Sequence, residues 1–453
     1  MAFTFRGGVH LNESKNTAAS AIRHMPAPAK VSIPLSQHIG AHCKPTVKVG
    51  DEVMRGQVIG AIDAGLGCPV HSSVSGKVKA IEEKYTAMGV KVANIVIESD
   101  GLNTLSPDVR PYEKELEDIT FDDLIEVVKN AGISGMGGAT FPTYAKISSA
   151  RGKVDRLIVN CAECEPYITA NHRLLLERPE SVIGGMKLML KVFGLKQGDL
   201  AIEDNKRDAI KIAEGMTAEN DLIKVRVLKT KYPQGDERQL IYALTGREIP
   251  AGGLPADVGC IVFNAETCSA IYNAFVTGMP LIERVVTVDG DCVVNPSNVL
   301  APIGTSYRDL VEFCGGFKAE PEKVVNGGPM MGAAQWDLDA PVTKGTSAIL
   351  VFSDPKPTRY EQPSACIHCG RCVGVCQMHL MPNYLSMFSR AGKWDLCEKY
   401  NVMSCVECGA CSYICPGGVS ITADNRVAKA KINEKRRAQK AAQAAAAAQK
   451  GAK

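Results

Sequence analysis

Eight of the seventeen cysteines in this 453-residue chain lie in two short runs near its C-terminal end. The first run reads CIHCGRCVGVC over residues 366–376, and the second reads CVECGACSYIC over residues 405–415. Each run has the spacing C-x2-C-x2-C-x3-C. Because the chain is long and shows no export signal, thiols clustered at a fixed spacing indicate metal ligands rather than disulfides.

The spacing predicts two 4Fe–4S clusters, with one ligand exchanged between the runs. In the two-cluster bacterial arrangement, the fourth cysteine of each run ligates the other cluster. The ligands expected for the first cluster are Cys366, Cys369, Cys372 and Cys415, and those expected for the second are Cys405, Cys408, Cys411 and Cys376. Pro416 follows the second run as this pattern expects, whereas Gln377 stands at the matching position after the first run. Structural zinc is the alternative, but it prefers two separated cysteine pairs around a tetrahedral ion.

Composition and charge narrow the class of protein. The chain is 45% hydrophobic and 22% charged, which is typical of a globular protein of roughly three domains. Its formal net charge of +3 is too small to argue for nucleic-acid binding, and we expect none. No run approaches the ~18 apolar residues of a membrane span, and the start MAFTFRGGVH lacks the pattern of a signal peptide. We therefore expect a cytoplasmic protein without a transmembrane segment.

A glycine-rich loop interrupts the middle of the chain. Residues 120–147 read TFDDLIEVVKNAGISGMGGATFPTYAKI, in which Thr120 and Asp123 match a capping box at the start of a helix. The loop GISGMGGATFPT follows this helix instead of a strand, so the ordinary Rossmann fingerprint fails. A loop of this kind exposes backbone N–H groups that suit a phosphate or a flavin, although a mere turn fits the pattern equally well.

The segments after the loop indicate an α/β domain. VDRLIVN, residues 154–160, is a β-branched run typical of a buried parallel strand. It delivers NCAECEP to its C-terminal end, where α/β sheets bind ligands. DLAIED, a helix and LIKVRVL continue the β/α alternation. Glu163 and Glu165 lie close to the glycine loop in sequence, with a solvated turn as the alternative interpretation.

Four segments connect the chain to a known family, in the order GISGMGGATFPTYAKI, VNCAECEP, YPQGDERQLI and FNAETCSAI. They resemble the FMN- and NADH-binding flavoprotein subunit of respiratory complex I. They are more similar still to the C subunit of the Rnf electron transport complex, a ferredoxin–NAD oxidoreductase. With the cysteine runs, the resemblance covers nearly the whole chain. It implies FMN, NAD(H) and two 4Fe–4S clusters as cofactors.

The resemblance also implies a set of cofactor-binding residues. The glycine loop would contact FMN, and Glu165 would face the ribose or nicotinamide side of NAD, with NAD(H) turnover dependent on Lys146 and Glu165. The complete set is Gly135, Gly137, Gly138, Phe141, Lys146, Asn160, Glu163, Glu165, Gly235, Asp236, Glu237, Asn264, Glu266 and Thr267. Two residues depart from the complex I pattern, because Met136 stands where that family has Arg and Ala162 where it has Asp.

Local patterns and the resemblance together predict an α/β multidomain protein with five parts. Residues 1–100 would form an N-terminal arm and a β sandwich similar to the lipoyl and biotinyl hammerhead, with Lys77 in a strand rather than at a modified hairpin tip. The other parts are a complex-I-flavoprotein-like FMN/NAD-binding α/β domain 101–284, a soluble-ligand-binding β-grasp domain 285–355, a two-cluster ferredoxin-like domain 356–425 and a basic Ala/Lys-rich tail 426–453.

Two shorter segments join these parts. NGGPMMG, residues 326–332, is expected to be a turn, with a second nucleotide loop as the alternative. SDPKPTRYEQPSA is expected to be a Pro-rich linker into the ferredoxin-like domain.

These parts suit a relay of electrons. Nicotinamide exchanges two electrons at once and an iron–sulfur cluster exchanges one, so a flavin is needed between them. The resemblance implies a peripheral subunit at the cytoplasmic face of the inner membrane, within an ion-translocating ferredoxin:NAD+ oxidoreductase. Its expected partners are NAD(H), the membrane and soluble subunits of the same complex, and ferredoxin reached through a partner subunit. The alternatives are a soluble NADH-dependent flavin and iron–sulfur oxidoreductase subunit, and a scaffold that carries clusters for the reductase of a redox regulator.

Overall fold

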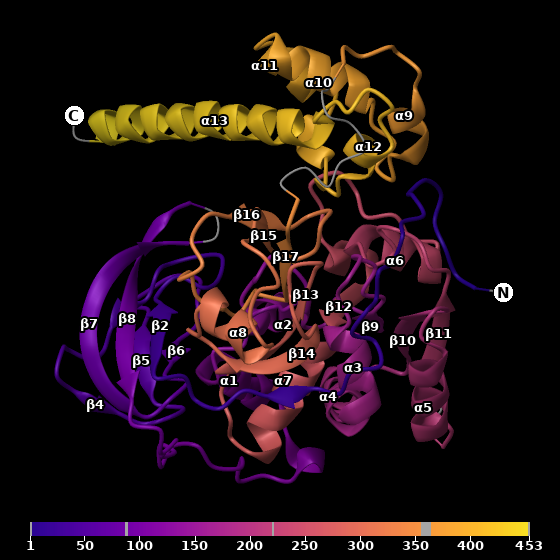
Figure 1. The fold of residues 1–453 in the computed structure, drawn as a ribbon. Helices are drawn as coiled ribbons and strands as arrows, with labels where there is room; N and C mark the ends of the chain where they lie inside the picture. The colour runs from indigo at the N-terminus through magenta and orange to yellow at the C-terminus, as the bar shows by residue number, and fades with distance from the viewer. Residues whose placement is uncertain (1, 87–88, 220–221, 355–363, 452–453) are drawn as a thin grey trace.

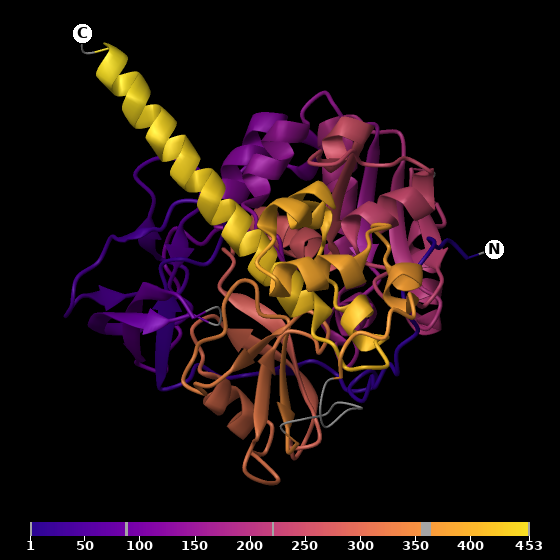
Figure 2. The ribbon, with the colours of Figure 1, turned by 90° about the horizontal axis from the view of Figure 1, so that it is seen from above.

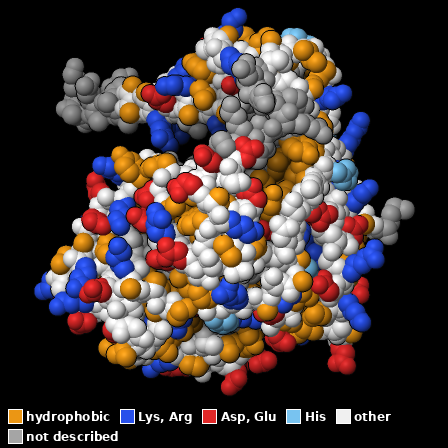
Figure 3. Space-filling view, viewed as in Figure 1, with side chains coloured by type: hydrophobic (Ala, Val, Ile, Leu, Met, Phe, Trp, Pro, Cys, Tyr) orange, Lys and Arg blue, Asp and Glu red, His pale blue; other side chains and the backbone are white. Residues whose placement is uncertain are grey.

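The computed structural model describes residues 2–86, 89–219, 222–354 and 364–451. In Figure 1 an N-terminal β unit, a second β unit and an α/β unit lie side by side, and the C-terminal helices sit above them. The predicted linker SDPKPTRYEQPSA falls largely on residues 355–363, which lie outside the described residues. Side chains of both charges are intermixed over the face shown in Figure 3.

The N-terminal unit is built from two antiparallel sheets. Its strands are β2 (Lys30–Pro34), β3 (Lys44–Pro45), β4 (Glu52–Val53), β5 (Val58–Ala61), β6 (Val70–His71), β7 (Gly76–Tyr85) and β8 (Lys91–Ser99). The larger sheet has the order β2-β8-β7-β4 and the smaller has the order β3-β5-β6. In the larger sheet, Val31 pairs with Ile97 and Ile33 with Ile95. All four side chains are fully buried, because alternate residues of a strand point to the same face.

A parallel sheet forms the centre of the α/β unit. Its elements are β9 (Arg156–Cys161), β10 (Gly198–Glu203), β11 (Ile223–Leu228), β12 (Cys260–Asn264), α1 (Phe121–Asn130), α2 (Thr143–Ala150), α3 (Ala170–Glu177), α4 (Pro179–Phe193), α5 (Arg207–Thr217), α6 (Glu237–Thr245) and α7 (Ala265–Val276). The strand order is β11-β10-β9-β12. The run predicted as a buried strand forms β9, and its Leu157, Ile158 and Val159 are fully buried between two parallel neighbours. Thr120 and Asp123 form the predicted capping box of α1.

The second β unit is a six-stranded sheet that includes a strand from the N-terminal arm. Its elements are β1 (Arg23–His24), β13 (Glu283–Asp289), β14 (Ser297–Pro302), β15 (Lys323–Asn326), β16 (Ala333–Gln335), β17 (Ala348–Phe352) and α8 (Tyr307–Phe313). The order β1-β14-β13-β17-β15-β16 puts β1 at one edge. Earlier in the arm, Phe3 forms a β-bridge with Leu228, and Val9 forms one with Tyr232. The arm therefore lies along the α/β unit and the second β unit, although the prediction groups it with the β sandwich.

Short helices and one long helix form the C-terminal module. They are α9 (Arg371–Val375), α10 (Pro382–Arg390), α11 (Trp394–Lys399), α12 (Ala410–Tyr413) and α13 (Ile421–Gly451). Leu385, Cys397, Ala428 and Ile432 are buried together where α13 crosses α10 and α11. The rest of α13 extends away from the body (Figure 1 and Figure 2), so the predicted basic tail continues a helix that begins at Ile421. Among the helices described, none combines the length and the apolar character that crossing a membrane requires.

A buried ion pair joins the second β unit to the α/β unit. Arg284 on β13 donates through Nε and Nη2 to the two carboxylate oxygens of Glu266 on α7, at 3.0 and 2.8 Å. Arg284 Nη1 also donates to the backbone carbonyl of Lys344. The Lys344 ammonium in turn donates to the carbonyls of Pro69 and Gly132 at 2.9 and 2.6 Å. This chain of contacts fixes the β sandwich, the beginning of the glycine loop and α7 relative to one another.

Arg284→Met should destabilise the fold by about 3–5 kcal/mol, because it leaves the buried Glu266 carboxylate without its cation. The shift of the urea unfolding transition measures the effect. Arg308→Met is the matched control, because Arg308 forms an exposed pair with Asp339 at 3.6 Å. Exposed pairs contribute about 0–1 kcal/mol. Equal shifts for the two variants would contradict a structural role for the buried pair.

Candidate functional site

The carboxyl ends of two neighbouring strands meet at one edge of the parallel sheet. Asn160, near the end of β9, lies opposite Asn264, the last residue of β12. Asn160 donates to the carbonyl of Gly235 at 2.8 Å and accepts the N–H of Ala162 at 3.1 Å. Asn264 accepts the N–H of Glu266 at 2.9 Å and so caps α7. Ligands of α/β sheets bind at this edge.

The glycine loop lies against the start of α7 at the same edge. The backbone N–H of Met136 donates to the hydroxyl of Thr267 at 3.1 Å. A Cβ on Gly137 would lie only 3.3 Å from the Cβ of Asn264, so glycine permits this close approach. The Met136 side chain is buried in the core, which explains how an apolar residue replaces the Arg of complex I at this position.

The remainder of the loop is open, and polar groups beside it are unpaired. Gly138 has φ +132° and open space where a Cβ would stand. The Gly135 N–H donates to the carbonyl of Phe141 at 2.9 Å, which closes the loop. The buried hydroxyls of Ser134 and Thr143 have no partner among the residues that the structure describes. Backbone N–H groups and hydroxyls in this arrangement fit FMN, whose phosphate and ring atoms accept hydrogen bonds.

Lys15, from the N-terminal arm, holds the acidic loop that follows β9. Its ammonium donates to the carbonyls of Glu163, Glu165 and Ile168 at 2.8, 2.8 and 2.7 Å. Burial lowers the pKa of Lys15. The Glu163 carboxylate accepts two backbone N–H groups at 2.6 and 3.1 Å at the start of α3. Sequence reasoning missed Lys15 because 148 residues separate it from Glu163 and no local motif marks it.

The Glu165 carboxylate is buried between the α/β unit and the second β unit. It accepts the backbone N–H groups of Met330 and Met331 at 3.1 and 2.9 Å, and the Tyr232 hydroxyl lies 3.4 Å away. Burial raises the pKa of Glu165 to about 7, although these hydrogen bonds oppose the rise. The segment NGGPMMG, predicted as a turn, therefore closes over Glu165.

The other acidic residues of the predicted set differ in their accessibility. Asp236 caps α6 by accepting two backbone N–H groups at 3.1 and 3.2 Å. Glu266 is bound on both oxygens by Arg284. Glu237 instead lies 3.1 Å from the Lys146 ammonium, and both of these side chains remain partly exposed. The Lys146–Glu237 pair is open to a ligand, whereas the other two carboxylates support the local fold.

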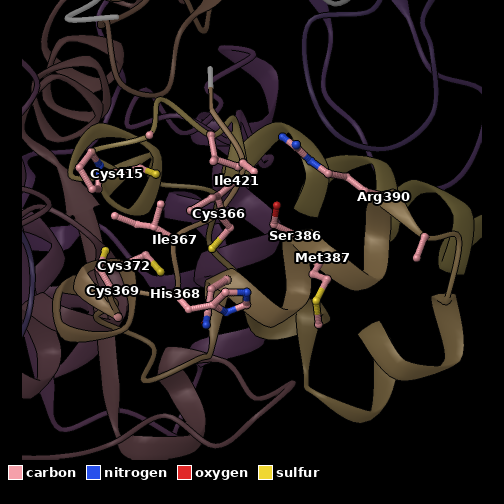
Figure 4. A pocket seen from close by; sticks show the side chains of 17 residues that line it. Cys366, Ile367, His368, Cys369, Cys372, Ser386, Met387, Arg390, Cys415 and Ile421 are labelled. Carbon is pink, nitrogen blue, oxygen red and sulfur yellow. The ribbon is translucent and has the colours of Figure 1, made fainter. Parts of the chain in front are cut away.

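Two cavities divide the eight thiols of the cysteine runs. A cavity of about 500 Å³ is lined by Cys366, Cys369, Cys372 and Cys415 (Figure 4). A cavity of about 20 Å³ is lined by Cys376, Cys405, Cys408 and Cys411. Each cavity thus collects three cysteines of one run and the fourth cysteine of the other. Within the described ranges, no three His, Cys, Asp or Glu side chains are arranged tightly around a point where a single metal ion would fit.

Tyr232 connects the acidic loop to the smaller cysteine cavity. Its buried hydroxyl donates to the carbonyl of Cys408 at 2.6 Å and lies 3.4 Å from the Glu165 carboxylate. Val9 and Ala410 are buried against the same ring in one apolar cluster. Sequence reasoning missed this contact, because Tyr232 and Cys408 are 176 residues apart.

A site suited to a flavin, in contact through the buried Tyr232 with a cysteine module suited to two clusters, defines an iron–sulfur flavoprotein. Four family models match the chain in the same order as these units. They are the RnfC Barrel sandwich hybrid domain over residues 3–102, the Nuo51 FMN-binding domain over 128–273, the SLBB domain over 285–334 and the 4Fe-4S dicluster domain over 360–419.

Full-length relatives identify the family. The chain is 47% identical over 436 residues to the C subunit of the Na(+)-translocating ferredoxin:NAD(+) oxidoreductase complex of Acetobacterium woodii, covering 96% of this chain and 98% of the relative. It is 44% identical over 407 residues to the C subunit of the proton-translocating complex of Clostridium ljungdahlii, covering 89% and 88%. It is 39% identical over 450 residues to the C subunit of the ion-translocating oxidoreductase complex of Rhodobacter capsulatus, covering 96% and 84%. The chain belongs to this family, the C subunits of the Rnf complexes, and the predicted family is confirmed.

Glu165 should make the stability of the protein fall as the pH rises. Its pKa is raised from 4.5 to about 7, so the folded protein keeps a proton that the unfolded chain releases between these values. The free energy of unfolding of the wild type should therefore decrease relative to that of Glu165→Gln from about pH 4.5 to about 7, and stay level with it above that. Urea denaturation across this range measures the difference. Parallel profiles for the two proteins would contradict a raised pKa.

Proposed function

We propose that this chain is the NAD(H)-reacting subunit of an ion-translocating ferredoxin:NAD+ oxidoreductase of the Rnf type. The observation that carries the proposal is the Tyr232 hydroxyl, which contacts Glu165 at the edge of the sheet and Cys408 in the cysteine module. The reactions named for the Acetobacterium and Clostridium relatives support the same activity.

FMN would lie at the carboxyl edge of the parallel sheet, against the glycine loop. When bound, FMN exchanges two electrons with nicotinamide and single electrons with iron–sulfur clusters. The chain would position it and exclude water. Asn160 holds the Gly235 carbonyl at 2.8 Å, and Lys15 holds three carbonyls of the acidic loop, so both walls of the cradle are fixed before a ligand binds.

NAD(H) would bind on the open side of this edge, beside Lys146. The Lys146 and Glu237 side chains are 28% and 39% exposed, so an incoming phosphate or ribose displaces their ion pair at little cost. The Phe141 side chain is 37% exposed and offers an aromatic face for stacking. With a pKa of about 7, Glu165 holds a proton in a substantial fraction of molecules at neutral pH, and the protonated carboxyl would donate to the Tyr232 oxygen 3.4 Å away.

The cysteines would hold two 4Fe–4S clusters in crossed sets. We define the first set as Cys366, Cys369, Cys372 and Cys415, and the second set as Cys405, Cys408, Cys411 and Cys376. The second set adjoins Tyr232, whereas Cys366 and Cys369 of the first set are exposed. The second set would therefore face the flavin edge, and the first set would face a partner protein.

Partner subunits would place this chain at the membrane. The described helices include none that could span a bilayer, so the ion path of a complex like those of the relatives would lie in other subunits. We expect peripheral attachment at the cytoplasmic face of the inner membrane, with membrane and soluble subunits of the same complex as partners and ferredoxin reached through one of them. The hammerhead-like β sandwich would serve docking, and the β-grasp unit would act as a spacer between redox centres.

Lys146→Ala should lower NADH:ferricyanide activity by about tenfold or more, because a charge-assisted hydrogen bond to a nucleotide contributes roughly 1.5–3 kcal/mol. Iron and flavin contents should not change. Lys153→Ala is the matched control, because Lys153 is exposed just after α2. A scaffold that merely carries clusters would show no such activity even in the wild type. Equal activities for the two variants would show that Lys146 does not contribute to NAD(H) binding.

Cys415→Ser should abolish the cluster of the first set and leave that of the second set, because the two runs exchange their fourth ligands. Electron paramagnetic resonance of the reduced protein, with iron quantitation, measures the loss. Cys376→Ser should give the reciprocal result. Cys397→Ser is the control, since Cys397 is buried on α11 outside both sets. If Cys415→Ser instead removed the cluster held by residues 405–411, each run would hold its own cluster.

A further inference from the structure

Gln377 is a buried amide at the wall of the smaller cysteine cavity. Its side chain is 2% exposed, and neither its nitrogen nor its oxygen has a partner among the described residues. The residue lines the cavity of the second set, directly after Cys376. The cluster-binding pattern has proline at this position, and the second run keeps it as Pro416.

An unpaired buried amide destabilises the folded protein, so the position of the Gln377 side chain indicates that a ligand supplies the missing hydrogen-bond partner. Folded proteins leave very few buried polar side chains without a hydrogen bond, because the lost contact with water is not replaced. The backbone carbonyl of Gln377 already accepts from the Gln239 amide at 3.2 Å, which fixes the main chain beside the cavity. The side-chain amide of Gln377 is therefore the part of this residue that has no hydrogen-bond partner among the described residues.

A second buried amide lines the same cavity. Asn425 is 1% exposed, and its Nδ2 donates to the thiol sulfur of Cys405 at 3.6 Å. In the larger cavity, the polar side chains of Ser386 and Arg390 are bonded to Asp424 at 2.5 and 2.8 Å. The wall of the smaller cavity therefore contains two buried amides, Gln377 and Asn425, whereas that of the larger contains one half-buried amide, Asn383, although the two runs share one cysteine spacing.

We propose that the amide nitrogen of Gln377 donates a hydrogen bond to a sulfur of the cluster held by the second set and, with Asn425, raises its reduction potential. Reduction adds negative charge to the cluster, and donors to its sulfurs stabilise that charge. This inference rests on the crossed sets of the proposed function. It makes Gln377 the residue that adjusts the cluster beside the flavin edge, and Pro416 supplies no such donor to the first set.

The test is a redox titration of the full chain, prepared without oxygen and followed by electron paramagnetic resonance. Cys415→Ser assigns the signals of the two clusters. In Gln377→Met, which has nearly the same size and no donor, the ratio of reduced to oxidised second-set cluster at a fixed potential should fall about tenfold, equivalent to about 59 mV for one electron. The first-set cluster serves as the internal control and should not shift. Asn425→Leu should shift the second-set cluster in the same direction.

Each result supports or overturns the proposal. An unchanged second-set potential in Gln377→Met with full iron content would overturn it, as would equal shifts of both clusters. If Gln377→Met takes up too little iron to be titrated, Gln377→Leu, which also lacks a donor, decides, and its second-set potential must fall. A wild-type chain that binds no iron would instead refute the proposed function, and the inference with it.

Discussion

The carboxylate of Glu266 is buried at the start of α7 and needs a cation, which Arg284 supplies from the second β unit. This requirement orients two units of the molecule. With the second β unit docked in this way, the backbone N–H groups of Met330 and Met331 reach Glu165 at the edge of the parallel sheet. Glu165 in turn lies beside Tyr232, whose hydroxyl reaches the cysteine module. A single buried ion pair is thus the first link in a chain of contacts that ends beside the second set. Removing one partner of such a pair is costly, because a charge is then left alone in a medium of low dielectric constant.

Much of the fold is visible in the sequence, because short-range rules govern it. The cysteine spacing, the capping box of Thr120 and Asp123, and the strand that becomes β9 each follow from neighbours in the chain. The glycine loop is also readable, since its place after a helix and its lack of side chains are local properties. What the sequence alone does not reveal are contacts between distant segments. Lys15 meets the acidic loop and Tyr232 meets Cys408 across 148 and 176 residues. Lys15 belongs to no short motif, and the motif YPQGDERQLI that begins with Tyr232 does not reveal its distant partner.

The acidic residues of the family motifs also show that the sequence does not reveal which groups a side chain contacts. A motif identifies a carboxylate but not its partner. Asp236 caps α6 and Glu266 is paired with Arg284, whereas the Lys146–Glu237 ion pair remains partly exposed to solvent. The two departures from the complex I pattern have a physical basis too, since Met136 and Ala162 are both buried in apolar clusters, in which apolar side chains pack.

The N-terminal arm bears on how the protein is synthesised. Gly8 donates its N–H to the carbonyl of Val375, and Phe3 pairs with Leu228 in the α/β unit. The ribosome makes the arm first, but Val375, its hydrogen-bonding partner in the cysteine module, is synthesised only with the first cysteine run. The arm therefore cannot bridge the α/β unit and the cysteine module until that run has been synthesised. A tag fused ahead of Phe3 would begin beside Leu228 in the α/β unit, whereas one placed after α13 would begin at the far end of that helix, on the opposite side of the molecule in Figure 1.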